Sequence, residues 1–155
     1  MSAGPARKPP RDPRRVAERI LAARDHGRRE LGRKLLARGF GAAEVERVLD
    51  DLQRENLLND EKFAASLTRQ ALERGRGLSY ARAQLAAKGV RSEAPAATLA
   101  DEVASLRSLL ARRQVDPSAL TDRGKRAKML RFLSGRGYSS AAIARAFGWT
   151  VTEDS

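Results

Sequence analysis

The chain has 155 residues, of which 41% are hydrophobic, 32% are charged and 5% are aromatic, and it carries a formal net charge of +12 at pH 7. This excess of positive charge favours an acidic partner, such as a nucleic acid, an acidic protein surface or an anionic membrane. The absence of cysteine excludes a disulfide framework and a thiolate metal site, and no apolar run approaches the roughly 20 residues that span a bilayer.

The N-terminal segment, residues 1–11, contains three prolines and no hydrophobic periodicity, which predicts a disordered basic tail. It also lacks the apolar core of a signal peptide, so we expect a cytoplasmic protein. An Asp-Pro pair follows, in which Asp12 has the features of a helix N-cap and the proline those of a first helical residue. The helix expected within 12–27 has Val16 and Ile20 on its apolar side.

A six-residue phrase occurs three times, with a leucine first, a basic residue fourth, a glycine fifth and an apolar or aromatic residue last. Glycine easily adopts the left-handed conformation just past a helix end, and the basic residue lies at the negative end of the helix dipole. The last residue is then expected to contact the leucine. Each phrase therefore predicts the end of one helix and the entry to the next. The phrases are LLARGF at 35–40, LAAKGV at 85–90 and LSGRGY at 133–138.

The phrases recur at a nearly constant interval, because their glycines at 39, 89 and 137 are 50 and 48 residues apart. An interval of this size, with helical periodicity such as that of Val45, Val48 and Leu52 and no strand signal, predicts tandem helical repeats. We expect an all-α fold, an elongated array of three tandem three-helix repeats of which the last is truncated. The expected parts are an N-terminal helix at 12–27, repeats at 28–76, 77–115 and 116–150, and a tail at 151–155.

The net charge alternates along the chain in step with the phrases. It is +8 over residues 1–40, +5 over 63–91 and +7 over 123–148, but −4 over 41–62 and −2 over 92–122. A solvated surface is the default explanation for any one basic residue, whereas the periodic excess favours a binding surface. If the repeats stack in register, the basic helices would form a continuous basic stripe. Its candidate residues are Arg29, Arg33, Lys34, Arg38, Arg74, Arg76, Arg82, Lys88, Lys125, Arg126, Lys128, Arg131 and Arg136.

Catalytic constellations are not recognisable in the sequence. His26, the only histidine, is expected near the end of the first helix, where solvation or a contact with the helix dipole is the usual role. The adjacent Asp50 and Asp51 would diverge by about 100° on a helix, and RGRG at 74–77 lacks the spacing of a phosphate-binding loop. The low aromatic content disfavours a base-stacking platform. We expect no enzymatic activity, no cofactor and no metal ion.

Three segments resemble the repeats of the bacterial RecX family of regulatory proteins. RRELGRKLLARGFGAAEVERVLDDLQRENLLNDEKFAASLTRQ, residues 28–70, resembles the first repeat. RGLSYARAQLAAKGV at 76–90 and KRAKMLRFLSGRGYSSAAI at 125–143 resemble the second and third. The most specific part of the likeness, which covers residues 16–148, is the ordered series GF, LLNDEKF and KGV.

The resemblance implies a non-enzymatic modulator of the RecA recombinase, built from tandem three-helix repeats and bound in the groove of the RecA–DNA filament. Such proteins typically inhibit RecA ATP hydrolysis and strand exchange, which would connect this chain with homologous recombination, DNA repair and the SOS response. The expected partners are the RecA filament and single- or double-stranded DNA without sequence preference, with no membrane and a monomeric chain. The alternative is an autonomous DNA-binding protein that contacts phosphates nonspecifically.

Overall fold

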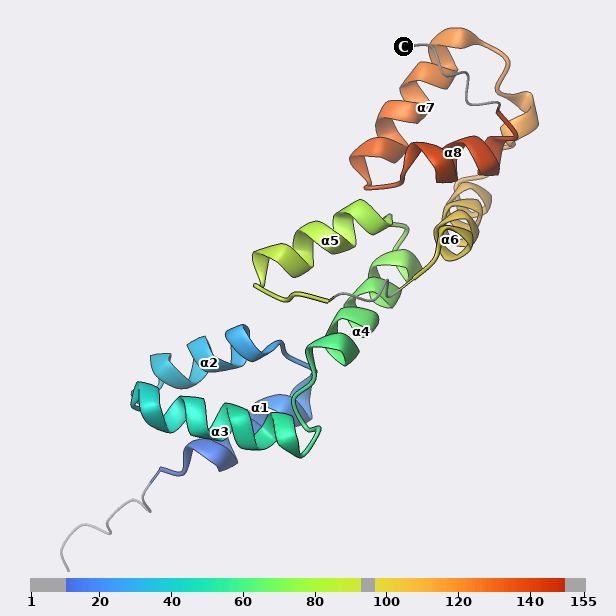
Figure 1. Ribbon diagram of the computed structural model, residues 1–155. Helices are drawn as coiled ribbons and strands as arrows, with labels where there is room; N and C mark the ends of the chain where they lie inside the picture. Colours follow the sequence, from blue (N-terminus) through green and yellow to red (C-terminus); the bar gives the residue numbers. More distant parts are fainter. Residues whose placement is uncertain (1–10, 93–96, 150–155) are drawn as a thin grey trace, which may run out of the picture. The chain divides into compact units, whose positions relative to one another are not determined.

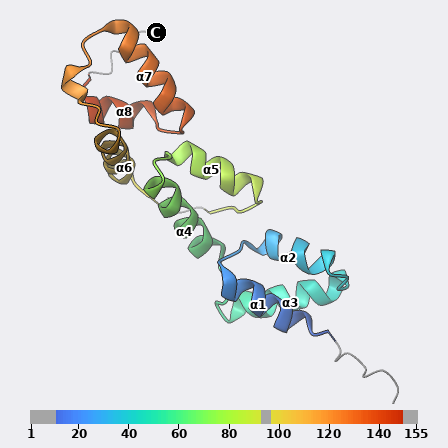
Figure 2. The same cartoon turned by 180° about the vertical axis from the view of Figure 1, so that it is seen from behind.

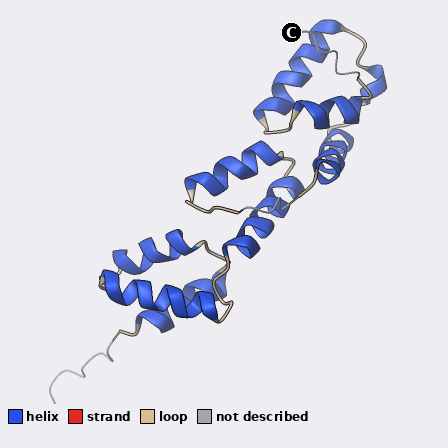
Figure 3. Cartoon of the chain, viewed as in Figure 1, coloured by secondary structure: helices blue, strands red, loops and turns tan. Residues whose placement is uncertain are grey.

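The computed structural model describes residues 11–92 and 97–149, and within these ranges every regular element is a helix (Figures 1 and 3). The all-α fold expected from the sequence is therefore confirmed. The tails expected at 1–11 and 151–155 lie outside the described residues, apart from Arg11. The helices are α1 (Pro13–Ala23), α2 (Arg28–Ala37), α3 (Ala42–Arg54), α4 (Asp60–Glu73), α5 (Leu78–Ala87), α6 (Leu99–Arg112), the 3₁₀ turn η1 (Pro117–Ala119), α7 (Arg123–Gly135) and α8 (Ser140–Phe147).

The chain divides into two compact units, the first ending at Asp60 and the second beginning at Glu61. In the first unit α1, α2 and α3 all contact one another, and Figure 2 shows α2 and α3 side by side from behind. The Asp12 side chain accepts a hydrogen bond from the Arg14 amide, which confirms the N-cap expected at the start of α1. The buried core of this unit consists of Ala17, Leu31, Leu35, Val45, Leu49, Leu52 and Leu58.

The repeated phrases end α2, α5 and α7 by the same backbone geometry. All three phrase glycines have positive φ, namely +90° at Gly39, +70° at Gly89 and +91° at Gly137. The amide of the last residue of each phrase donates to the carbonyl of its leucine, as in a Schellman motif. The helix ends predicted from the phrases are thus confirmed. These bonds are Phe40 to Leu35 at 3.4 Å, Val90 to Leu85 at 3.0 Å and Tyr138 to Leu133 at 3.1 Å.

In the second unit, α6 shares a hydrophobic core with α7 and α8. A smaller cluster of Phe63, Ala64 and Val90 joins α4 to the residue that follows the second phrase. The repeat boundaries expected at 77 and 116 stay predictions, but α6, which precedes residue 116, packs with the helices that come after it. The larger core consists of Leu106, Leu109, Leu110, Leu133, Tyr138, Ile143 and Phe147.

A buried carboxylate on α6 holds the starts of two other helices. Glu102 is only 1% exposed. Its Oε1 accepts hydrogen bonds from the Leu78 amide (3.1 Å) and the Ser139 amide (3.0 Å), and its Oε2 accepts one from Ser139 Oγ (2.7 Å). Because helix N-termini carry unpaired amides and a partial positive charge, one carboxylate satisfies donors at both α5 and α8.

The start of α5 also contacts the third phrase through backbone hydrogen bonds. The Gly77 amide donates to the Arg136 carbonyl at 2.9 Å, and the Ser79 amide donates to the Gly137 carbonyl at 3.1 Å. A Cβ atom at Gly77 would overlap the Gly137 carbonyl, and one at Gly137 would lie 2.6 Å from Tyr80 Cβ. Glycine is therefore required at both positions by the close approach of these two backbone segments.

We predict that Glu102→Ala lowers the free energy of unfolding by about 3 kcal/mol, because it leaves buried donors on α5 and α8 without an acceptor. Urea denaturation followed by circular dichroism measures this loss. The exposed Glu73→Ala on α4 removes the same charge and should cost less than about 0.5 kcal/mol. Equal losses in the two variants would contradict the role assigned to Glu102.

Gly77→Ala should destabilise the protein by about 3 kcal/mol or more, since its methyl group would overlap the backbone at Gly137. Gly135→Ala is the matched control, because nothing lies within 4 Å of its added Cβ and alanine is favoured over glycine in a helix. The control should be neutral or slightly stabilising in the same thermal melts. A Gly77→Ala protein as stable as the parent would show that the contact is dispensable.

Candidate nucleic-acid interface

Four arginine side chains of the second unit gather around the end of α7. Burial, together with the guanidinium groups of Arg76, Arg113 and Arg112, lowers the pKa of Arg136 from its ordinary value. Nearby like charges lower the pKa of a cation in this way, and the Arg136 guanidinium still stays protonated at physiological pH. We name Arg76, Arg112, Arg113 and Arg136 the arginine cluster.

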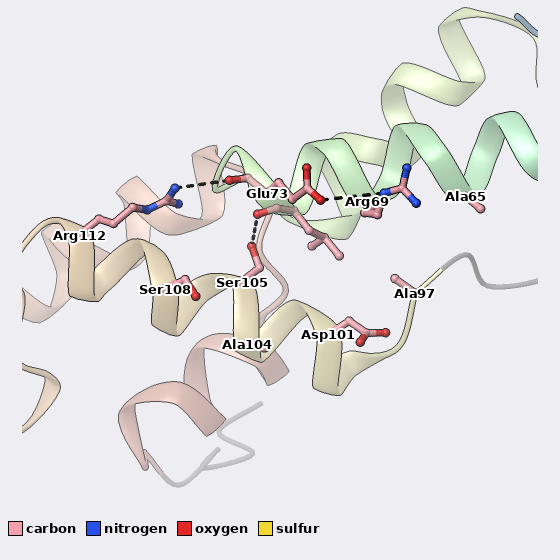
Figure 4. Close-up of a pocket in the computed structure, with 10 residues that line it drawn as sticks. Ala65, Arg69, Glu73, Ala97, Asp101, Ala104, Ser105, Ser108 and Arg112 are labelled. Atoms are coloured by element: carbon pink, nitrogen blue, oxygen red, sulfur yellow. Dashed lines mark hydrogen bonds and ion pairs between the residues drawn. The ribbon is translucent and has the colours of Figure 1, made fainter. Parts of the chain in front are cut away.

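Backbone carbonyls and aromatic rings hold this cluster in place. Arg136 Nε donates to the Gly75 carbonyl at 2.7 Å and its Nη2 to the Arg74 carbonyl at 3.1 Å. Arg112 Nη1 donates to the Glu73 carbonyl at 3.4 Å, as Figure 4 shows. These contacts orient the guanidinium groups but leave their charges uncompensated.

Ring faces complete the support of the cluster. The guanidinium carbon of Arg76 lies 5.0 Å from the ring centroid of Tyr80, and those of Arg113 and Arg136 lie 4.4 and 5.6 Å from the Phe132 centroid. Among the described residues, no carboxylate lies within ion-pair distance of any of the four arginines. The cluster therefore presents uncompensated positive charge in a fixed geometry, which suits phosphate or carboxylate groups of a partner.

Helix α7 adds a second group of cations to this unit. It has no acidic residue, and its basic side chains are all exposed and without an ion-pair partner in the part of the chain described. The Arg126 guanidinium lies 5.2 Å from the Trp149 centroid, and Trp149 stacks on Phe147 at 4.3 Å. The exposed basic residues of α7 are Arg123, Lys125, Arg126, Lys128 and Arg131.

The structure distributes the residues of the basic stripe over both units. Arg29, Arg33 and Arg38 are exposed on or just after α2, whereas Lys34 is half-buried and bonded internally. Arg74, Arg76 and Arg136 come together in the second unit, Arg82 is exposed on α5, and Lys88 caps the end of that helix. The stripe that would join the two units stays a prediction.

Sequence reasoning missed Arg112 and Arg113, the two cluster members from α6. Their segment, 92–122, has a net negative charge, and this average concealed the arginine pair. A signal for these residues lay in their place at the end of a helix. Arg112 is the last residue of α6 and Arg113 is its C-cap, just before Gln114, which has a positive φ of +56°. Basic residues in the last turn of a helix are electrostatically favourable there.

The environment of His26 differs from the solvation or dipole contact expected for it. The residue is only 3% exposed. Its Nδ1 lies 2.8 Å from the Arg24 carbonyl oxygen and its Nε2 lies 2.6 Å from Lys34 Nζ. Because the ammonium group of Lys34 can only donate, Nε2 accepts and Nδ1 carries the proton that is donated to Arg24. His26 is thus a buried neutral residue, and burial lowers its pKa from 6.5.

A cavity of about 690 Å³ lies between α4 and α6, and half of its lining residues are alanine or serine (Figure 4). Its two carboxylates have other partners, since Glu73 pairs with Arg69 at 3.9 Å and Asp101 forms a capping box with Thr98. Within residues 11–92 and 97–149, no cluster of three or more potential ligands could hold a metal ion. No described helix combines the length and apolar character required to cross a membrane.

We predict that protein stability falls as the pH drops below about 6.5, because the unfolded chain protonates His26 more readily than the folded one does. The dependence should reach at most about 1.4 kcal/mol per pH unit, the value for one proton. Thermal melts between pH 7.5 and 5 measure it, and His26→Gln should show a shallower slope over the same window. Identical slopes would mean that another group is responsible.

Comparisons with known proteins agree with the architecture. The models for the first and third three-helix domains of RecX match residues 14–52 and 100–147, which bears out the expected tandem three-helix repeats. Regulatory protein RecX of Chromohalobacter salexigens is 38% identical over 146 residues, covering 90% of this chain and 95% of that protein. The Leptothrix cholodnii protein of the same name is 37% identical over 82% of each chain. The crystal structure of RecX from Lactobacillus salivarius shares the fold, with a TM-score of 0.71 at 22% identity over 88% of this chain and 92% of that one.

Proposed function

Because this chain belongs to the RecX family of regulatory proteins, we propose that it binds the RecA–DNA filament in its groove and inhibits RecA. As a non-enzymatic cytoplasmic regulator, it would lower ATP hydrolysis, strand exchange and the recombination and SOS activities that depend on them. The arginine cluster is the observation that carries this proposal. It supports a partner that offers several fixed negative charges at once.

The electrostatics of the cluster favour a polyanionic partner. Four like charges held close together repel one another, and a bound anion relieves this repulsion. A nucleoprotein filament presents DNA phosphates alongside protein side chains, so both charge attraction and shape can contribute to binding. Arginine is suited to such a surface because its planar guanidinium can hold two oxygens of one phosphate or carboxylate.

Helix α7 supports binding without sequence preference. It exposes five lysine and arginine side chains, residues that commonly contact phosphates and position a protein on DNA. The helix contains no asparagine or glutamine, which are the side chains that read adenine in the major groove. This composition favours attraction to the phosphate backbone and provides no side chain that reads adenine.

A titration of RecA ATP hydrolysis on single-stranded DNA, at near-physiological salt, tests the proposal directly. Inhibition at substoichiometric amounts of this protein is the expected result. The competing function is that of an autonomous DNA-binding protein, which would coat phosphates whether or not RecA is present. Tight binding to bare DNA without any effect on RecA would favour that function and overturn the proposal.

Reversing three charges on α7 with Lys125→Glu, Lys128→Glu and Arg131→Glu should weaken filament binding about tenfold or more, since each substitution removes an attractive charge and adds a repulsive one. The apparent affinity can be taken from the midpoint of the ATP hydrolysis titration. Circular dichroism should show an unchanged fold, because all three side chains are exposed.

The matched control reverses three exposed arginines elsewhere in the second unit and so changes the net charge equally. It should retain most of the affinity. Unchanged affinity of the α7 variant at low salt would remove α7 from the interface. An equal loss in both variants would mean that only the net charge matters. The control substitutions are Arg91→Glu, Arg107→Glu and Arg145→Glu.

A further inference from the structure

A second concentration of uncompensated positive charge lies in the first unit, where α1 begins beside the end of α2. A cavity of about 610 Å³ is lined there by four arginines, Arg11, Arg15, Arg19 and Arg38, and by a single acidic side chain, Asp12. The formal charge of this lining is +3, from four guanidinium groups and one carboxylate. We name this cavity the N-terminal arginine pocket. Three of its arginines are not part of the basic stripe.

The helices position the four guanidinium groups around one space. Arg15 and Arg19 are four residues apart, so they project from the same face of α1. Arg38 caps the end of α2. Arg11 is fixed against that end, because its Nη1 donates to the Arg38 carbonyl at 3.0 Å and its guanidinium lies 5.5 Å from the Phe40 centroid. Arg11 is thus held in place at the rim of the pocket before any ligand arrives.

The acidic residues around the pocket are engaged with other groups. Glu18 and Glu55 both bind Arg14, the neighbour of Arg15 that does not line the pocket, and these contacts raise the pKa of Arg14. The Asp12 carboxylate accepts from the backbone amide of Arg14 as the N-cap of α1.

Two further acids of the first unit also pair with an arginine outside the pocket. Glu46 and Asp50 pair with Arg28 at 2.7 and 2.8 Å. Among the described residues, Arg15 and Arg19 have no carboxylate partner, although like charges one turn apart destabilise a helix. The fold therefore keeps an unfavourable arrangement that a bound anion would relieve.

We propose that the N-terminal arginine pocket binds phosphate groups of a nucleic-acid backbone. The nonpolar part of its lining, Val16 and Ile20, packs against the core of the first unit, so the pocket offers no exposed apolar anchor. Protein partners are usually held by such anchors at the centre of the contact, whereas nucleic-acid sites are polar and strongly positive. No aromatic side chain lines the pocket for base stacking, so the contact is independent of sequence.

This inference deepens the proposed function by assigning DNA contacts to the first unit, and its test needs no RecA. Fluorescence anisotropy with bare labelled DNA, single-stranded and duplex, measures affinity at several salt concentrations. The double variant Arg15→Gln/Arg19→Gln should bind about tenfold or more weakly at about 0.1 M salt. It should also lower the log–log salt slope on duplex by about 1.8, because each phosphate that an arginine no longer neutralises reduces the slope by about 0.9. Its thermal stability should equal or exceed that of the parent, because the substitution removes a repulsion.

The matched control is Arg47→Gln/Arg54→Gln, which removes the same charge from exposed positions on α3 outside the pocket. It should keep nearly the full affinity and salt slope. A pocket variant that binds DNA like the parent, or a control with the same loss, overturns the proposal. Weaker binding of the pocket variant to a polyglutamate peptide, with DNA affinity intact, would also overturn it by assigning the pocket to acidic protein. Because RecA is absent, neither outcome depends on whether the protein inhibits the recombinase.

Discussion

The second unit depends on the buried carboxylate of Glu102. A helix that begins inside a protein has backbone amides without partners, and α5 and α8 both begin beside α6. The carboxylate accepts from the Leu78 and Ser139 amides and from Ser139 Oγ, so one charge on α6 fixes where both helices start. Arg136 lies three residues before Ser139 and bonds to the loop that precedes Leu78. Two members of the arginine cluster, Arg76 and Arg136, therefore lie within three residues of the backbone amides that this carboxylate holds.

Pairing, rather than the total charge, decides which arginines are available to a partner. In the first unit Arg14, Arg24, Arg28 and Arg54 are each held by at least one carboxylate. Arg11 of the N-terminal arginine pocket and the arginines of the arginine cluster contact carbonyl groups or ring faces instead. Carbonyl and ring contacts orient a guanidinium without neutralising it, so these side chains keep their attraction for anions. A net charge of +12 would not distinguish the two groups.

What could be read from the sequence was local in origin. The helix ends at the three phrases and the N-cap at Asp12 depend on residues within a few positions of one another. The burial of His26 and the role of Glu102 could not be read in this way, because they depend on packing. Leu78 and Ser139 are 24 and 37 positions from Glu102. Whether an arginine is free to bind a partner also depends on residues far away in the sequence. Arg14, for example, pairs with a glutamate 41 residues away.

The contact between Gly77 and Gly137 joins two segments through hydrogen bonds of the main chain. The backbone hydrogen bonds of this junction specify no side-chain partner, so at these two positions the requirement is glycine itself. Interfaces built from interlocking side chains require coordinated change on both surfaces. A repeat that contains its own glycine turn instead already carries the backbone groups that make this contact. Duplication of such a repeat could lengthen the chain without redesigning the neighbour to which the new copy attaches.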